Sequence, residues 1–511
     1  MIAETIPALL RSNAQQSPRR EAVVDPDSRI DYASLDAATR RRAAALIEAS
    51  VNKGHRVGLL MQNSVEWAVT AFAVMRMGAV LVPLSTMLRP AELETQLAIA
   101  GVRHLIAVPQ FLNRDFRGEL ADLDRARLPS LSNIWWSDEP LADATKQAQA
   151  VADTLAERLK PADEMAVLFT SASSGDPKGV IHTHGGALRA NAAGHDARCV
   201  RADTRLYLPM PLFWTGGFAG GLISALNAGC TLITEAVPRP ASTLDLIERE
   251  KVTLFRGWPD QAERMARDPA FAEADLAALQ PGSLDAVMPG ASPPHGARGN
   301  LFGMTESFGP YCGHPLDDIL PAEKSGSCGK PFKGIKVRIA DYESGAILGA
   351  GKEGSIQIGG PNILKGICGR EREDVFTNDG WFDTGDMGHV DKDGFLFFAG
   401  RRDDMVKVSG ATAYPREAEQ VLQQLPGVVS AAVCAIELDG QTRFGAAITL
   451  DPSSPGLHEI ASKAAGVLSA FKQPRLWLLL DTPDALPRKT SDKIDKAALR
   501  ALIERDGVEI T

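Results

Sequence analysis

The sequence predicts a multi-domain α/β protein, with a large N-terminal domain of layered α/β subdomains plus a β-rich subdomain, followed by a small C-terminal α+β domain. The chain has 511 residues, which exceeds what one hydrophobic core usually supports and corresponds to about three units of roughly 150 residues. Its 44% hydrophobic and 23% charged residues are typical of a globular protein. Strand and helix patterns also alternate along the chain, and this alternation defines the layers.

The N-terminal third alternates between helical and strand patterns. Apolar residues recur at helical spacing over residues 35–50, and a buried-strand run follows at 56–61. The pattern repeats with a helix around 65–77 and a strand over 78–83. Further short β-rich runs lie at 105–108, 166–170, 231–234 and 254–257. This order favours layered architecture with parallel strands.

Glycine becomes frequent beyond Ser325, which indicates a smaller β-rich subdomain. Its short strands are expected at 336–339, 354–358 and 395–398. A boundary follows near Gly400, so we divide the chain into an N-terminal domain of residues 1–402 and a C-terminal domain of residues 403–511.

The C-terminal tail has the pattern of a separate small domain. An amphipathic helix over 416–424 precedes strands over 428–436 and 444–450. Another helix and a closing strand over 476–480 complete the expected order.

Charge, cysteine spacing and hydropathy exclude several classes of protein. The net charge is -9 and residues of both signs are mixed throughout the chain, so the sequence shows no basic region of the kind that binds a nucleic acid. The six cysteines lie far apart without CxxC spacing, which argues against a disulfide framework or a zinc site. No basic stretch with an apolar core begins the chain, and no apolar run approaches the roughly 20 residues that span a bilayer. We expect a cytoplasmic protein without integral membrane association.

The segment from Thr170 to Gly179 is a candidate phosphate loop. It follows the strand over 166–170 and is too rich in small and hydroxyl residues to pack a core. Backbone N–H groups, hydroxyls and one ammonium group together can compensate phosphate charge. The side chains concerned are those of Thr170, Ser171, Ser173, Ser174 and Lys178. The spacing is not that of the common P-loop, and an isolated turn of this composition is more often a surface loop.

Five motifs, in order, resemble those of the adenylate-forming superfamily, which contains acyl-CoA synthetases, luciferases and peptide-synthetase adenylation domains. The loop is similar to the superfamily signature TSGTTGxPKG. Downstream follow Phe302-Gly-Met-Thr-Glu306, Gly380-Trp-Phe-Asp-Thr-Gly-Asp386, Gly400-Arg-Arg-Asp-Asp-Met-Val-Lys-Val-Ser-Gly410 and Pro487-Arg-Lys-Thr-Ser-Asp-Lys493. The N-terminal third, from Asp31-Tyr-Ala-Ser-Leu35 through Gly78-Ala-Val-Leu-Val-Pro83, also looks like the superfamily. The resemblance covers nearly the whole chain and is closest to acyl-CoA synthetases.

The resemblance implies a two-step reaction that uses ATP, Mg²⁺ and coenzyme A. A carboxylate attacks the α-phosphorus of ATP with loss of pyrophosphate, and a thiol then attacks the acyl-adenylate. The first barrier is mainly repulsion between anions, so cations and positioned donors should dominate. The phosphate ligands implied are Thr170, Ser171, Ser173, Ser174, Gly175 and Lys178.

The FGMTE motif supplies the metal and phosphate ligands that the resemblance implies. Glu306 would hold Mg²⁺, a hard cation that prefers carboxylate and phosphate oxygens. Thr305 would contact phosphate, and Phe302 and Gly303 would border the nucleotide, with the Phe302 ring against adenine. Without the resemblance, Glu306 is typical of a surface glutamate and Phe302 of a core residue.

Three later motifs carry the remaining implied roles. Asp386 and Arg401 would bind the ribose, although a capping aspartate with a surface ion pair is the plainer interpretation of that turn. Lys493 would reach the reacting carboxylate and α-phosphate, whereas composition alone favours a solvated lysine in a basic run. Asp403 would be the hinge of a mobile C-terminal domain. Gly410 would line the pantetheine passage beside Lys407, which is nearly as typical of a surface lysine.

Four departures from the superfamily pattern limit what carries over. Asp492 replaces the usual glycine before the catalytic lysine, and Trp214 occupies the place of a common histidine near the acyl carboxylate. The connection from Gly290 to Phe302 is shorter than usual, and Ala172 replaces the first loop glycine.

The predicted function is that of an acyl-CoA synthetase for a hydrophobic acid, fatty, aromatic or alicyclic, with a homodimer as a candidate assembly. The pocket candidates are Phe213, Trp214, Gly216, Gly217, Phe218, Gly290, Ser307, Phe308 and Gly309, and plain core packing is their alternative. Two other functions stay open: an adenylating enzyme that loads a carrier protein, and a non-catalytic nucleotide-binding relative.

Overall fold

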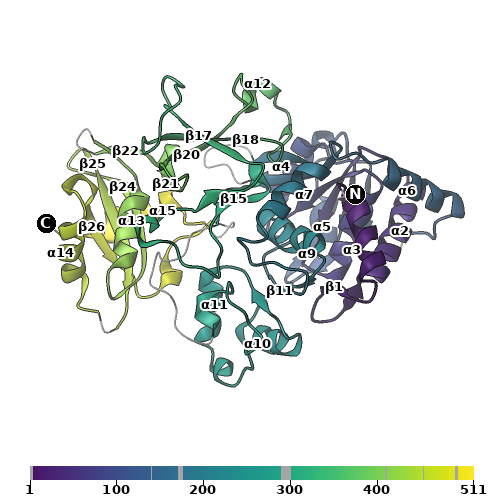
Figure 1. Cartoon of the computed structure of the whole chain (residues 1–511), viewed down its shortest axis with the longest axis horizontal. Helices are drawn as coiled ribbons and strands as arrows, with labels where there is room; N and C mark the ends of the chain where they lie inside the picture. Colours follow the sequence, from purple (N-terminus) through teal and green to yellow (C-terminus); the bar gives the residue numbers. More distant parts are fainter. Residues whose placement is uncertain are drawn as a thin grey trace. The chain divides into compact units, whose positions relative to one another are not determined.

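The structure is a computed structural model that describes residues 4–139, 141–170, 177–288, 301–408, 411–452, 454–489 and 493–510. The chain divides into two compact units, the first formed by Met1–Lys336 with Ile358–Phe382 and the second by Val337–Gln357 with Asp383–Thr511. Each unit has its own sheets and helices (Figure 1). The predicted multi-domain α/β class is confirmed.

The seven-stranded sheet of the first unit has the order β19-β10-β9-β4-β3-β5-β8. Strands β9, β4, β3, β5 and β8 are parallel neighbours, whereas β10 runs antiparallel to both β9 and β19. The strands are β3 Arg56–Leu60, β4 Val80–Leu84, β5 His104–Ala107, β8 Asn133–Trp136, β9 Glu164–Thr170, β10 Lys178–Thr183 and β19 Gly366–Ile367. The apolar runs thus predicted the parallel centre of this sheet.

A five-stranded sheet of the same unit has the order β13-β11-β12-β1-β2. All neighbours are parallel except β1 and β2, which form an antiparallel edge. The strands are β1 Glu21–Val24, β2 Arg29–Asp31, β11 Arg205–Tyr207, β12 Thr231–Ile233 and β13 Leu254–Phe255. The carboxyl ends of parallel strands are where open α/β sheets usually bind ligands.

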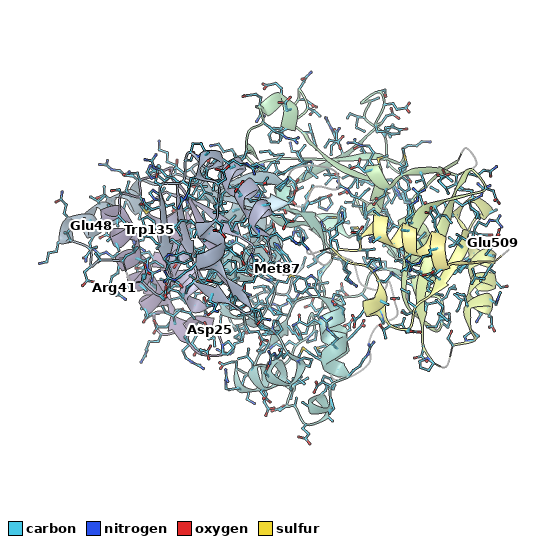
Figure 2. All side chains as sticks on the ribbon, turned by 180° about the vertical axis from the view of Figure 1, so that it is seen from behind. Asp25, Arg41, Glu48, Met87, Trp135 and Glu509 are labelled. Atoms are coloured by element: carbon cyan, nitrogen blue, oxygen red, sulfur yellow. The ribbon has the colours of Figure 1, made fainter. Side chains whose placement is uncertain are left out.

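Helices cover these sheets, and α2, α3 and α6 pack beside one another (Figure 1). Helix α3 is almost entirely buried, and the carboxylate of Asp25, labelled in Figure 2, accepts a 2.8 Å hydrogen bond from Val65 N–H at its first residue. Near its end the buried Arg76 forms a 2.6 Å ion pair with Asp36. The helices of the unit include α1 Ile6–Gln16, α2 Tyr32–Glu48, α3 Val65–Arg76, α4 Pro90–Ala100, α5 Phe116–Ala121, α6 Lys146–Arg158, α7 His184–Ala193, α10 Pro240–Arg249, α11 Pro259–Ala266 and α12 Arg372–Val375.

Two further pieces of the first unit position the candidate site. One is a continuous helical run, α8 Thr215–Gly217, the π-helical segment η2 Phe218–Ile223 and α9 Ser224–Ala228. The other is a small sheet in the order β14-β15-β16, formed by Phe302–Met304, Gly309–Gly313 and Lys330–Pro331. A short 3₁₀ turn, η5 Thr305–Ser307, joins β14 to β15.

The second unit contains one four-stranded sheet upstream of residue 403 and another downstream. The first has the order β17-β18-β20-β21, with β17 Lys336–Ala340, β18 Gly354–Gly359, β20 Phe382–Val390 and β21 Leu396–Arg401. Most of this sheet belongs to the same compact unit as the C-terminal residues. The functional division at residues 402 and 403 remains a prediction.

The C-terminal sheet has the order β24-β25-β26-β27, preceded by the hairpin β22 Val406–Val408 and β23 Ala411–Ala413. Helices α13 and α14 pack on one face around Phe444 and Trp477, and α15 packs on the other through Leu499 and Ile503. The elements are α13 Pro415–Gln424, β24 Val428–Leu438, β25 Gln441–Leu450, α14 Leu457–Val467, β26 Pro474–Leu479, α15 Lys496–Asp506 and β27 Val508–Glu509.

The expected closing strand over 476–480 is β26, but it does not close the domain. Helix α15 follows it, and β27, which contains Glu509 of Figure 2, pairs with β26. The helix was missed because few of its residues are buried and charges interrupt its apolar face. In the part of the chain that the structure describes, no helix has both the length and the hydropathy needed to cross a membrane.

Candidate active site

Thr170 and Lys178 stand directly opposite each other where β9 ends and β10 begins. The hairpin therefore brings one hydroxyl and one ammonium group to the two ends of the predicted phosphate loop. Both residues are half-buried. The other predicted phosphate ligands, Ser171, Ser173, Ser174 and Gly175, and the departure at Ala172, lie outside the described residues.

Residues 364–368, which include β19, form backbone hydrogen bonds with both β10 and the FGMTE motif. The N–H of Cys368 donates to the carbonyl of Gly179 at 2.8 Å, and the N–H of Leu364 donates to the carbonyl of Glu306 at 2.7 Å. The start of β10 and the backbone of the predicted magnesium ligand are therefore tied to one segment.

Ser307 closes the turn that carries Thr305 and Glu306. Its hydroxyl lies 2.6 Å from the carbonyl oxygen of Gly309 and accepts a 3.2 Å hydrogen bond from the N–H of Met304. The side chain is only 1% exposed. As a predicted pocket residue, Ser307 can act only through the shape of this turn.

Phe308 stabilises the same turn through the packing of its buried ring. Its backbone is left-handed, with φ of 55°, which costs a non-glycine residue about 1–3 kcal/mol unless packing compensates. The ring is buried and meets His182 edge-on at 4.9 Å and Phe218 at 5.9 Å between ring centres. Phe308 and Phe218, both predicted pocket residues, thus belong to the packed core.

His182 is a site residue that sequence reasoning missed. It lies in β10, four residues after Lys178, and it is buried against Phe308. Burial lowers the pKa of His182 to about 4, and a hydrogen bond with the backbone of Thr305 opposes that shift. The ring is therefore neutral at pH 7 and links the strand of the phosphate loop to the Thr305 turn. No motif marks it, because only the tertiary contact reveals the link.

Thr305 faces the start of a helical run. Its Oγ1 lies 3.0 Å from Oγ1 of Thr215, the first residue of the continuous helical run that ends at Ala228. A helix N-terminus favours negative charge, because its first N–H groups lack intrahelical partners. The predicted phosphate contact of Thr305 therefore has a favourable electrostatic setting.

Glu306 is buried at 7% exposure on the same turn. Among the residues that the structure describes, no group of three or more His, Cys, Asp or Glu side chains could hold a metal ion by itself. Mg²⁺ is usually bound through one or two carboxylates, waters and substrate phosphates, so it needs no such group. A single buried carboxylate beside a predicted phosphate contact fits this donor set.

Gly303 allows β14 and β15 to approach each other closely. A Cβ atom at this position would lie 2.2 Å from the carbonyl oxygen of Gly309, which no side chain tolerates. Its neighbour Phe302, the predicted adenine contact, is half-buried and meets Tyr311 at 5.5 Å between ring centres.

The predicted acyl pocket is aromatic where the structure describes it. Trp214 is half-buried and contacts Phe213 and Trp258 edge-on, with ring centres 5.5 and 6.2 Å apart. Trp258 follows β13 and was not predicted, although an isolated tryptophan after a strand was a visible signal. Gly217 packs against the backbone of Pro211, since a Cβ atom at Gly217 would lie 2.2 Å from the carbonyl oxygen of Pro211. Gly290 lies outside the described residues.

In the second unit, β20 and β21 place Asp386 and Arg401 side by side. They are paired residues of the two strands, and Nη1 of Arg401 donates to Oδ1 of Asp386 at 2.7 Å. Burial raises the pKa of Asp386, while the charge of Arg401 opposes that rise. Gly385, within β20 and with φ of 71°, leaves room for the guanidinium, because a Cβ atom there would lie 3.1 Å from Nη2 of Arg401. The two predicted ribose ligands are thus brought together.

Lys493 is exposed and lies three residues before α15. Its carbonyl accepts a 2.8 Å hydrogen bond from Lys489 N–H, and an isolated bridge pairs Arg488 with Ile494. Helix α15 begins shortly afterwards, capped by Asp495. Asp492 lies outside the described residues.

Asp403 is exposed in a 3₁₀ turn flanked by two ion pairs. On one side Arg402 contacts Asp383 of β20 at 3.2 Å, and on the other Asp404 contacts Lys496 of α15 at 2.7 Å. The side chain of Lys407 and all of Gly410 lie outside the described residues.

Comparison with known proteins identifies the family of this chain. The model of the family described as AMP-binding enzyme matches residues 10–368. A (methyl-dioxo-octahydroindenyl)propanoyl:CoA ligase of Mycobacterium tuberculosis is 31% identical, covering 98% of this chain and 99% of its own. The indoleacetate–CoA ligase of Aromatoleum aromaticum is 30% identical, covering 96% and 97%. A crystal structure of an anthranilate CoA ligase with anthranoyl-AMP has a TM-score of 0.79 at 24% identity, covering 99% and 98%.

The chain therefore belongs to the AMP-binding enzyme family. Within that family it is an acyl-CoA synthetase of the AMP-forming type, because its similarity to named acyl-CoA ligases extends over nearly its full length.

Proposed function

We propose that this acyl-CoA synthetase activates a hydrophobic carboxylic acid in two half-reactions. The acid first attacks the α-phosphorus of ATP to give an acyl-adenylate and pyrophosphate, and the thiol of coenzyme A then displaces AMP. The observation that carries the proposal is that the two elements expected to bind phosphate, the strand of the phosphate loop and the Thr305–Glu306 turn, contact the same residues. The phosphate-loop strand and the Thr305–Glu306 turn share the 364–368 segment and the buried ring of His182.

Thr170, Lys178 and Thr305 act on the phosphates. The Lys178 ammonium lowers the repulsion between the nucleotide and the attacking carboxylate, while the hydroxyls of Thr170 and Thr305 fix the orientation of phosphate oxygens. Glu306 would hold Mg²⁺, which supplies charge neutralisation at the phosphates when bound. The buried turn keeps the Glu306 backbone in place before substrate arrives.

Asp386 and Arg401 bind the ribose hydroxyls, and Lys493 acts on the reacting carboxylate. The carboxylate of Asp386 accepts hydrogen bonds from hydroxyl groups, and its ion pair with Arg401 keeps it oriented. An ammonium at Lys493 offsets the negative charge that develops during attack. Asp403 lies between two ion pairs, so rotation there would move α15 and Lys493 relative to β20.

The acid is expected to be apolar near its carboxylate because Trp214 and Trp258 face each other edge-on after β11 and β13. The relatives named for indoleacetate and for a fused-ring propanoate support a cyclic or aromatic acid over a short polar one.

Hydroxylamine trapping with a panel of acids, with and without coenzyme A, tests the proposal. We expect ATP-dependent hydroxamate from apolar acids and a thioester when coenzyme A is added. Glu306→Gln should raise the Mg²⁺ concentration needed for half-maximal rate by about 10- to 100-fold or more, since loss of a residue that only supports a metal ligand already costs that much affinity. Glu164→Gln, at the start of β9 in the same unit, is the matched control.

The other two functions give different outcomes in the same assay. Hydroxamate without thioester would favour loading of a carrier protein. ATP binding without hydroxamate from any acid would favour a non-catalytic relative and overturn the proposal.

A further inference from the structure

The hydroxyls of Thr215 and Thr305 lie 3.0 Å apart, at hydrogen-bond distance, although 90 residues separate them in the sequence. Both residues are half-buried, and their neighbours Gly216 and Gly303 are exposed. The contact is therefore not enclosed in the core, and a ligand can reach it from solvent. It joins the turn that is expected to contact phosphate to the segment that is expected to contact the acid.

Hydrogen bonds fix the backbone on both sides of this contact. The N–H of Phe308 donates to the carbonyl of Thr305 at 2.9 Å. On the other side, the buried side chain of Asn63 accepts a 2.7 Å hydrogen bond from the N–H of Leu212, three residues before Thr215. A threonine side chain is also stiff at χ1. The direction of each hydroxyl proton is therefore the main freedom that remains at this contact.

That direction decides whether Thr305 can serve a phosphate. A hydroxyl carries one proton and two lone pairs, whereas an ionised phosphate oxygen can only accept. If Thr305 donates to Thr215, it has no proton left, and its lone pairs face the anion. If Thr215 donates to Thr305, the proton of Thr305 is free to point at a phosphate oxygen. Only the second arrangement favours phosphate binding at Thr305.

We propose that Thr215 is a positioning residue for adenylate formation. It donates its hydroxyl proton to Oγ1 of Thr305, and the proton of Thr305 is thereby directed to a phosphate oxygen of ATP. The inference rests on the proposed function and adds to the phosphate site a residue that follows Trp214 directly in the chain. Thr215 acts through Thr305 and makes no contact of its own with the nucleotide.

Pyrophosphate exchange in the full-length enzyme tests this role in wild type, Thr215→Val, Thr305→Val and the double variant. Valine keeps the branched shape of threonine and removes the hydroxyl. Thr215→Val should lower kcat/KM for ATP by about 3- to 10-fold, as loss of one hydrogen bond does. The double variant should be no slower than Thr305→Val alone, because a residue that acts only through Thr305 has nothing left to position. Thr215→Ser should restore the rate.

The matched control is a second hydroxyl pair, far from the candidate site in the sequence. The hydroxyls of Ser430 and Thr449 lie 2.7 Å apart between β24 and β25. Thr449→Val removes one hydroxyl from that pair, as Thr215→Val does from the first. It should keep the wild-type kcat/KM for ATP. Melting temperatures of all variants are recorded alongside the rates.

Each outcome decides the inference separately from the proposed function. Wild-type exchange in Thr215→Val or in Thr305→Val overturns the inference and leaves adenylation standing. Losses that multiply in the double variant also overturn it, because Thr215 would then act on something other than Thr305. Equal losses in Thr215→Val and Thr215→Ser, with lower melting temperatures, identify a packing role and overturn it as well.

If Thr215→Val does not fold, Thr215→Ala in the wild-type and Thr305→Val backgrounds decides by the same comparison. If wild type exchanges pyrophosphate with no acid, the proposed function itself fails, and the inference fails with it.

Discussion

The turn at Thr305 and the turn at Lys493 carry the two sides of the proposed chemistry, and they are built in opposite ways. The first is buried, with Ser307 bonding its backbone and Phe308 packed beneath it. At the second, Lys493 is exposed, and its carbonyl accepts a hydrogen bond from the N–H of Lys489. Phosphate and metal ligands benefit from fixed geometry, whereas a lysine that must approach and withdraw benefits from an exposed position.

The largest effect is expected at the exposed turn. Lys493→Ala should lower adenylate formation by on the order of 10² to 10³, as loss of one transition-state donor does. The melting temperature should not change, because the side chain is exposed. Pyrophosphate exchange measures the rate. Lys489→Ala, on the opposite arm of the same turn, is the control, and near-normal exchange in Lys493→Ala would refute its role.

Next in size is the hinge. Asp403→Pro should spare pyrophosphate exchange and lower thioester formation by about tenfold or more, because proline fixes the backbone angle that a rotation must change. The two half-reactions are measured separately in one preparation. Equal loss of both would argue for simple damage to the turn.

The strand pair β14–β15, which carries the buried turn, should respond in stability more than in rate. Gly303→Ala places a Cβ atom 2.2 Å from the carbonyl oxygen of Gly309, so the β14–β15 pair must shift. We expect a loss of about 1–3 kcal/mol or more, as for other overpacked positions, seen as a lower melting temperature. Gly366→Ala has open space around it and should change little. Similar melting curves for both variants would contradict the tight pairing.

The smallest effect concerns pH. Burial lowers the pKa of His182 and of His184 to about 4, compared with about 6.5 in an unfolded chain. The folded protein therefore binds fewer protons than the unfolded chain between these values, and stability present above pH 6.5 is lost as pH falls toward 4. Each ring contributes up to about 1.4 kcal/mol per pH unit in that window. Melting temperatures between pH 7.5 and 5 measure this slope, and His182→Gln should make it shallower. An unchanged slope would show that His182 is not buried neutral.

The sequence predicted elements whose signal is local. Apolar runs located β3, β4 and β9, and ordered motifs located Thr305, Glu306, Asp386 and Arg401. It did not predict strand β10 or its antiparallel pairing with β9, because residues 178–183 form no apolar run. His182, Thr215 and Trp258 were missed because their roles arise from contacts between segments far apart in the chain.

Supplying a presynthesised acyl-adenylate to Lys493→Ala, together with coenzyme A, tests most directly whether the two turns have separate tasks. If Lys493 serves only adenylation, thioester formation from the supplied adenylate should stay within about threefold of wild type while pyrophosphate exchange falls by on the order of 10² to 10³. Loss of thioester formation to the same extent as exchange would contradict that division.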